Sequence, residues 1–169
     1  TYEIAANYMP AVKANYANVF INDTLWGLYT NIQPVNKDFL NDYFGDKHNS
    51  FFKCNPENLD VSPGGENSNL SNSHGSDSLD YQSYYDLKSD YGWRDLYNLI
   101  DTLNNYAGSL DLLLDIDRTL WMHSLNYTLV NFDSYIGYSQ NYYLYKTKNN
   151  QFSPILWDLN MSFGSFRLT

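Results

Sequence analysis

The sequence predicts a single α+β domain over residues 1–169. Hydrophobic residues make up 43% of the chain, enough for one sizeable core. The elements are expected in the order hairpin, helix, strand, loop, two helices, hairpin, unlike the regular strand–helix alternation of α/β proteins. They are expected at residues 18–33, 36–46, 50–56, 91–106, 114–130, 141–146 and 151–158.

The first half is predicted from turn and capping signals. Asn22-Asp23 lies between two runs of strand-forming residues, which indicates a hairpin. Asn36 can cap the helix that follows, and Gly45 suits a left-handed residue at its end. Pro56 then ends a short strand, because proline cannot donate to a sheet ladder.

The second half is predicted from hydrophobic spacing. Apolar residues recur at helical intervals in 91–106 and in 114–130, and the second helix is expected to bury Ile116, Leu120, Trp121 and Leu125. A loop is expected at 131–140. Two strands joined by the turn "TKNN" follow it, which predicts a second hairpin.

Residues 57–80 are predicted to form a flexible loop or insertion. The segment is rich in Ser, Asn and Gly and poor in apolar residues. Little burial energy is therefore available to offset the entropy of ordering the chain. We expect high mobility and little secondary structure here.

Charge and cysteine content exclude several classes of protein. The net charge is −9, from 10 basic and 19 acidic residues, so we expect no nucleic-acid binding and a preference for basic protein partners. No apolar run approaches the roughly 20 residues of a membrane span. The lone Cys54 cannot form an internal disulfide or build a zinc site, and is expected to be a buried thiol.

Three polar residues in the last third follow an order found in protein kinases. Asp133 lies in a loop after a helix, Asn141 opens a strand, and Asp158 follows the second strand of a hairpin. In protein kinases such an Asp accepts the substrate hydroxyl proton, and the Asn and the second Asp bind Mg²⁺. The order predicts a metal-dependent phosphotransferase. The alternative is a hairpin whose acids are solvated turn residues.

A kinase of this kind also needs a lysine that contacts the nucleotide phosphates. Lys53 is the first candidate, because its strand precedes the long loop and lies well before Asp133. Lys88 is the second, and an ordinary surface lysine is the alternative for both. "SPGG" lacks the strand context of a nucleotide-binding glycine loop. His123 fits a structural histidine better than a catalytic one.

Four segments in order resemble the CotH family, spore-coat-type atypical protein kinases of bacteria and some fungi. They are "ANVFINDTLWGLYTNIQPVNKDFLNDYFGD", "YYDLKSD", "NFDSYIGYSQNYYLYK" and "ILWDLNMSFGSF". The resemblance implies a divergent protein-kinase-like fold, ATP with Mg²⁺ or Mn²⁺, and phosphorylation of Ser or Thr in Ser-rich secreted or surface proteins. It also implies an extracellular or cell-surface location in a bacterium. Because the chain starts with Thr1 and stops soon after Gly164, we expect a domain truncated at one or both ends.

The resemblance assigns roles to individual residues. Asp133 in "NFDSY" matches the catalytic Asp, Asp158 in "WDLN" matches the metal-binding Asp, and Asn141 lies where a second metal ligand is expected. Many members have Asp at the position of Asn160 and Glu at the position of Gln33. These two differences leave a catalytically inactive scaffold as an alternative. The wealth of Tyr, Trp and Asn leaves a carbohydrate-binding or adhesion module as a second alternative.

Overall fold

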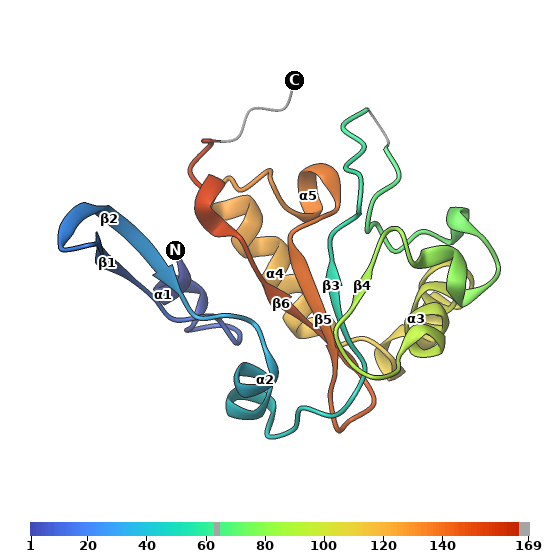
Figure 1. Cartoon of the computed structure of the whole chain (residues 1–169). Helices are drawn as coiled ribbons and strands as arrows, with labels where there is room; N and C mark the ends of the chain where they lie inside the picture. The colour runs from blue at the N-terminus through green and yellow to red at the C-terminus, as the bar shows by residue number, and fades with distance from the viewer. Residues whose placement is uncertain (63–64, 166–169) are drawn as a thin grey trace.

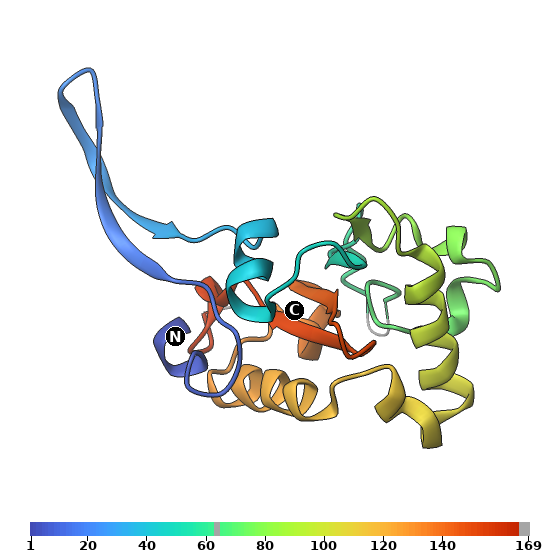
Figure 2. The same cartoon turned by 90° about the horizontal axis from the view of Figure 1, so that it is seen from below.

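The computed structural model describes residues 1–62 and 65–165 and shows a body with a projecting arm (Figure 1). The arm is the antiparallel ribbon of β1 (Ala14–Ile21) and β2 (Thr24–Ile32), which extends away from the rest of the chain (Figure 2). The body contains an antiparallel sheet of order β4-β3-β5-β6. This arrangement confirms the predicted α+β class.

The longer elements of the body follow the predicted order, whereas short elements at Tyr2–Ala5, Asp86–Leu87 and Tyr135–Tyr138 were not predicted. The α-helices are α1 (Tyr2–Ala5), α2 (Lys37–Phe44), α3 (Trp93–Asn105), α4 (Ile116–Thr128) and α5 (Tyr135–Tyr138). The strands are β3 (Phe51–Cys54), β4 (Asp86–Leu87), β5 (Tyr142–Lys146) and β6 (Phe152–Leu156). Short 3-10 helices lie at Asn72–His74, Ser78–Tyr81, Ala107–Leu112 and Leu159–Met161. None of the described helices has the length and apolar character needed to cross a membrane.

The turn and capping signals behave as predicted. Asn22 and Asp23 have φ values of 49° and 60°, as a two-residue hairpin turn that matches strand twist requires. The side chain of Asn36 accepts hydrogen bonds from the first turn of α2, and Gly45 ends that helix with φ 64°. Local sequence therefore determines these two elements.

Helices cover both faces of the sheet and close the core. α3 and α4 pack on the face that carries Phe52, whereas α2 packs on the opposite face, where Phe44 contacts Tyr145 (Figure 2). Cys54 is fully buried, as expected, and burial raises the pKa of its thiol well above the usual value. The sheet is therefore an interior layer of the body.

The buried stripe of α4 differs from the prediction. Leu120 is 61% exposed and Ile116 is 38% exposed, whereas Met122, Leu125 and Leu129 are buried. The spacing of these three residues places them on one face of the helix, which packs against β6. The prediction was wrong for Ile116 and Leu120 because several helical stripes fit the sequence, and packing selects one of them.

We expect Leu125→Ala to cost about 2–4 kcal/mol of unfolding free energy, because it leaves a cavity in the core. Leu120→Ala is the matched control on the same helix and should change the free energy by less than about 0.5 kcal/mol. Urea denaturation of both variants measures the difference. Equal losses would contradict the observed orientation of α4.

Part of the Ser/Asn/Gly-rich segment is packed into the body. Its described residues contain two 3-10 helices, and Asn67, Ser68 and Leu70 are buried. The hydroxyl of Tyr142 donates to the Ser68 carbonyl at 2.6 Å, and the hydroxyl of Tyr85 accepts from the Leu70 amide at 2.8 Å. Hydrogen bonds with buried tyrosines thus hold Ser68 and Leu70 in place, although the composition of the segment predicted a flexible loop. Flexibility of the remaining segment stays a prediction.

Candidate functional site

The sheet topology brings Asn141, Asp158 and Lys53 to the same end of neighbouring strands. Asn141 directly precedes β5 and Asp158 lies two residues after β6. Because these strands pair antiparallel, with Tyr142 opposite Leu156, the start of one adjoins the end of the other. Lys53 lies on β3, the neighbouring strand on the other side of β5.

Hydrogen bonds attach Asp133 to this same end of the strands. Asn141 donates from Nδ2 to the backbone carbonyl of Asp133 at 3.0 Å. Gln140 donates from Nε2 to the carboxylate oxygen Oδ1 of Asp133 at 2.6 Å. Sequence reasoning missed Gln140, whose role is to orient that carboxylate. Its only signal was its place immediately before Asn141.

The loop that carries Asp133 is built on the C-terminal end of α4. Asn131 bonds Asn126 through both backbone and side chain, and the Ser134 hydroxyl donates to the Asn131 carbonyl at 2.6 Å. All three side chains are buried. Gly137 packs so closely on the carbonyl of Phe132 that a Cβ would lie 1.9 Å from its oxygen, so no larger residue fits there. These contacts fix the backbone on both sides of Asp133.

The residues that flank Asp158 are fixed to the same part of the body. Asp158 itself has a left-handed φ of 54°. The amide of Leu159 donates to the hydroxyl of Tyr2 at 3.3 Å. Further on, the Phe163 amide donates to the Leu129 carbonyl at 2.6 Å, at the end of α4 where the Asp133 loop begins. The two acidic loops are therefore held side by side.

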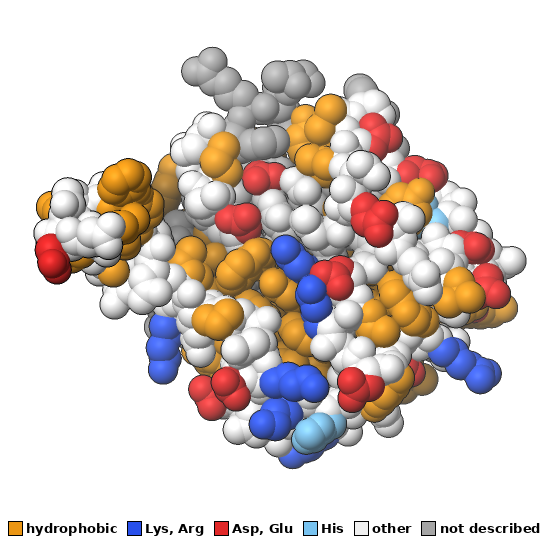
Figure 3. Space-filling model, in the orientation of Figure 1, with side chains coloured by type: hydrophobic (Ala, Val, Ile, Leu, Met, Phe, Trp, Pro, Cys, Tyr) orange, Lys and Arg blue, Asp and Glu red, His pale blue; other side chains and the backbone are white. Residues whose placement is uncertain are grey.

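The charges of the site interact. Asp158 is half-buried, and burial raises the pKa of its carboxyl group above the usual range. The negative charge of Asp133 raises this pKa further, whereas the positive charge of Lys53 lowers it. The three groups are thus near one another. Acidic and basic side chains adjoin near the middle of the face drawn in Figure 3.

Lys88, the second lysine candidate, has a different partner. It forms an ion pair with Asp86 of β4, and both side chains are about half exposed. Lys53 lies opposite Asp86 and Tyr143 in the sheet. Lys53 is thus near enough to Asp158 to lower the pKa of its carboxyl group, whereas Lys88 is paired with Asp86.

A cavity lies beside the loop that carries Asp158. Its volume is about 720 Å³, within the range of small-molecule sites, and it lies between α1, the root of the arm and α2. Its lining includes Tyr2, Lys13, Tyr43, Leu159 and Asn160. The chain therefore has room for part of a substrate directly next to the acidic loop.

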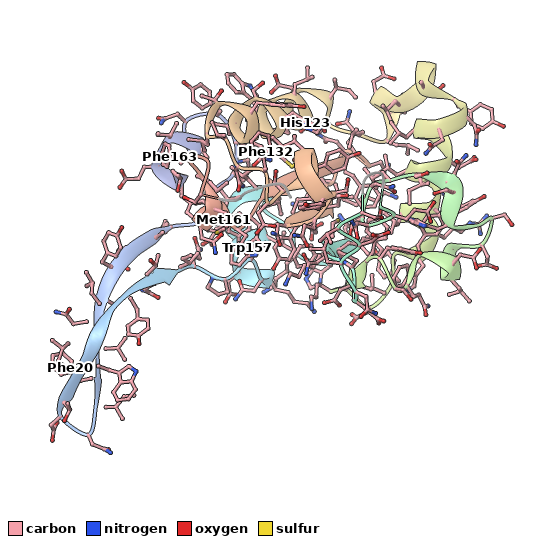
Figure 4. The ribbon with its side chains drawn as sticks, turned by 90° about the horizontal axis from the view of Figure 1, so that it is seen from above. Phe20, His123, Phe132, Trp157, Met161 and Phe163 are labelled. Atoms are coloured by element: carbon pink, nitrogen blue, oxygen red, sulfur yellow. The ribbon has the colours of Figure 1, made fainter. Side chains whose placement is uncertain are left out.

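An aromatic pair lies on the sheet next to these charges. The ring of Trp157 meets the ring of Tyr143 edge-on at a centroid distance of 5.7 Å. Burial, together with the charges of Asp86 and Asp158 among others, raises the pKa of Tyr143 to about 12. Tyr143 is therefore neutral at physiological pH. Trp157 lies in the body, far from Phe20 near the end of the arm (Figure 4).

The donor set fits Mg²⁺ better than zinc. Asp158 and Asn141 offer only oxygen ligands, which hard cations prefer. No group of three or more His, Cys, Asp or Glu residues that could hold a metal occurs in residues 1–62 and 65–165. Mg²⁺ is commonly bound by one or two carboxylates together with water and substrate phosphates. The residues present therefore suit a cation shared with a nucleotide.

His123 and Gln33 make contacts that stabilise the fold. His123 packs edge-on against Tyr135 at 5.2 Å, and burial lowers the pKa of its imidazole. Gln33 accepts a hydrogen bond from the Lys13 amide at 3.1 Å and so fastens the root of the arm.

The raised pKa of Asp158 leads to a prediction about stability. The pKa of the Asp158 carboxyl is higher in the folded state than in the unfolded state. The folded protein therefore loses stability as the pH rises through the folded-state pKa, because ionisation of this group is unfavourable in the fold. Asp158→Asn cannot ionise, so we expect a higher Tm than the parent at pH 7. The difference should vanish below the unfolded pKa of about 3.9. Thermal unfolding from pH 3 to 8 without metal measures it, and a lower Tm at pH 7 would contradict the prediction.

Comparison with protein families identifies the family of the chain. The family model described as CotH kinase protein matches residues 2–168. A search of curated proteins found no match. Because the family match covers nearly all of the 169 residues, the chain belongs to the CotH family.

Proposed function

We propose that this protein is an ATP-dependent kinase that phosphorylates Ser or Thr in secreted or surface proteins. The observation that carries the proposal is the convergence of Asp133, Asn141 and Asp158 at one end of the sheet strands, with Lys53 on the adjacent strand. Phosphoryl transfer depends mainly on positioning and charge neutralisation, which these residue types can supply.

Asp133 would act on the acceptor. Its carboxylate can accept a hydrogen bond from a Ser or Thr hydroxyl and take the proton as the oxygen attacks phosphorus. Gln140 holds one carboxylate oxygen, and Asn141 holds the backbone carbonyl of the same residue. These bonds restrict the orientation of the acid, so little reorganisation is needed when the hydroxyl arrives.

Asp158 and Asn141 would hold Mg²⁺ or Mn²⁺, and Lys53 would contact the nucleotide phosphates. The cation supplies the charge that neutralises the phosphate oxygens and aligns them for transfer. The NH₂ group of Asn141 donates a hydrogen bond to the backbone carbonyl of Asp133. The oxygen of the same amide would then be the atom that binds the cation. The side chain of Asn141 would then connect the acceptor side and the metal side of the site.

The acceptor is expected to be a basic, Ser-rich protein segment. The chain carries a net charge of −9, which favours the approach of a positively charged partner. An incubation with Mg²⁺, radiolabelled ATP and Ser-rich peptides of different charge tests this proposal. Transfer to the basic peptide supports it, whereas absence of both nucleotide binding and transfer would overturn the enzyme proposal.

An inactive surface scaffold is the alternative. Asn160 is exposed and is not a carboxylate, and Gln33 is engaged with Lys13. Absence of transfer to the chain itself and to peptides would favour this function. The carbohydrate-binding alternative expects aromatic rings flat on one exposed face, whereas Tyr81, Tyr85, Tyr142 and Tyr145 are buried in the core.

A further inference from the structure

The arm exposes large apolar side chains along its length. Tyr16, Phe20, Leu25, Trp26 and Leu28 are each between 57% and 75% exposed. A two-stranded ribbon without further packing is only marginally stable in water. Exposed apolar surface of this extent on a projecting element is typical of an interaction site.

The strand register gathers four of these five side chains on one face. Phe20 lies opposite Leu25, and Leu28 lies opposite Asn18. Because side chains alternate between the faces of a strand, Tyr16, Phe20, Leu25 and Leu28 share a face. Trp26 lies at the irregularity of β2 next to Leu25. We name these five residues the arm face.

The arm is almost free of charge. Between residues 14 and 32, Asp23 at the turn is the only charged side chain, whereas the whole chain has a net charge of −9. Edge strands are usually protected from pairing by Lys or Pro, and neither residue occurs between positions 14 and 32. A strongly charged partner would find nothing complementary here. An apolar, uncharged surface is the better match.

We propose that the arm face binds the arm face of a second copy of this chain and forms a two-fold symmetric dimer. Self-complementary apolar patches are the usual basis of such dimers. The arm face offers about 600 Å² of exposed surface per copy, from typical areas of large apolar side chains. Two copies would bury about 1,200 Å², the lower limit of stable specific interfaces.

Charge also favours association through the arms. A strand of eight residues is about 27 Å long, and the Debye length at physiological salt is about 8 Å. Arms that contact each other along the arm face therefore keep the two acidic bodies apart. Association through the bodies would instead bring like charges together.

The test measures molar mass by sedimentation and light scattering across about 1 to 200 μM protein, a range that detects micromolar dissociation constants. We expect a monomer–dimer equilibrium in the parent. Leu28→Lys and Phe20→Lys should each raise the dissociation constant at least about tenfold, because each places a charge in the apolar contact. Leu120→Lys, at a residue of similar exposure on α4, is the matched control and should leave it unchanged.

Salt gives an independent readout. Raising the salt concentration should not weaken the dimer, because the contact is apolar and the acidic bodies are kept apart by the arms. Circular dichroism and Tm of the variants verify that the body remains folded. A parent that stays monomeric at every concentration would overturn the proposal. So would a dimer that responds to Leu120→Lys and not to the arm variants, and neither result depends on kinase activity.

Discussion

Replacing Asp158 with Asn is expected to abolish measurable binding of Mg²⁺–ATP and, with it, phosphate transfer. The cation is the largest charge in such a site, and the position after next holds Asn160 and not a second carboxylate. We expect a loss of affinity of at least about 100-fold, the effect of removing a principal metal ligand or its support. Calorimetric titration of Mg²⁺–ATP into parent and variant measures it.

Two properties make this variant informative. Asp158 has a left-handed backbone, which Asn tolerates well, and we expect the neutral side chain to raise the Tm at pH 7. Lost binding would therefore not reflect lost folding. Asp117→Asn, at an exposed acid in the first turn of α4, is the control for the change in net charge. If Asp158→Asn binds Mg²⁺–ATP as tightly as the parent, Asp158 is a structural strand-end residue.

Asp133→Asn is expected to separate transfer from binding. We expect the transfer rate to fall by about 10²- to 10⁴-fold, the usual contribution of a positioned acid–base group. The affinity for Mg²⁺–ATP should change only a few-fold, because this residue would act on the acceptor hydroxyl. The amide oxygen of Asn can still accept the hydrogen bond from Gln140, so the loop should keep its conformation.

The comparison of the two variants identifies the roles. Single-turnover transfer with saturating nucleotide isolates the chemical step from binding. Equal loss of nucleotide affinity in both variants would mean that Asp133 is a metal ligand. Unchanged transfer in Asp133→Asn would show that another group accepts the proton, and the catalytic assignment would fail.

Several elements could be predicted from the sequence because their causes are local. The turn at Asn22-Asp23 and the two ends of α2 depend on backbone conformations and caps supplied by neighbouring residues. The polar residues at the ends of β5 and β6 were also visible as interruptions of apolar runs. The resemblance of four sequence segments predicted the CotH family, and the family match confirms it.

Other features depend on contacts between distant segments. The choice of the Leu125 stripe of α4 over Leu120 is made by β6, and the order at residues 67–70 is imposed by tyrosines far along the chain. Such contacts cannot be read from periodicity or composition, because the partner residue is set by the three-dimensional packing.

The sequence by itself determined the longer strands and helices and the acidic residues of this protein, because short-range geometry and residue chemistry are sufficient for them. The short elements α1, β4 and α5 were not predicted. Only the tertiary structure decided which residues from distant segments lie next to each other. It placed Gln140 on the carboxylate of Asp133 and Lys53 near Asp158, and it left the arm face exposed. These outcomes depend on antiparallel pairing and helix packing, which bring together residues that are far apart along the chain.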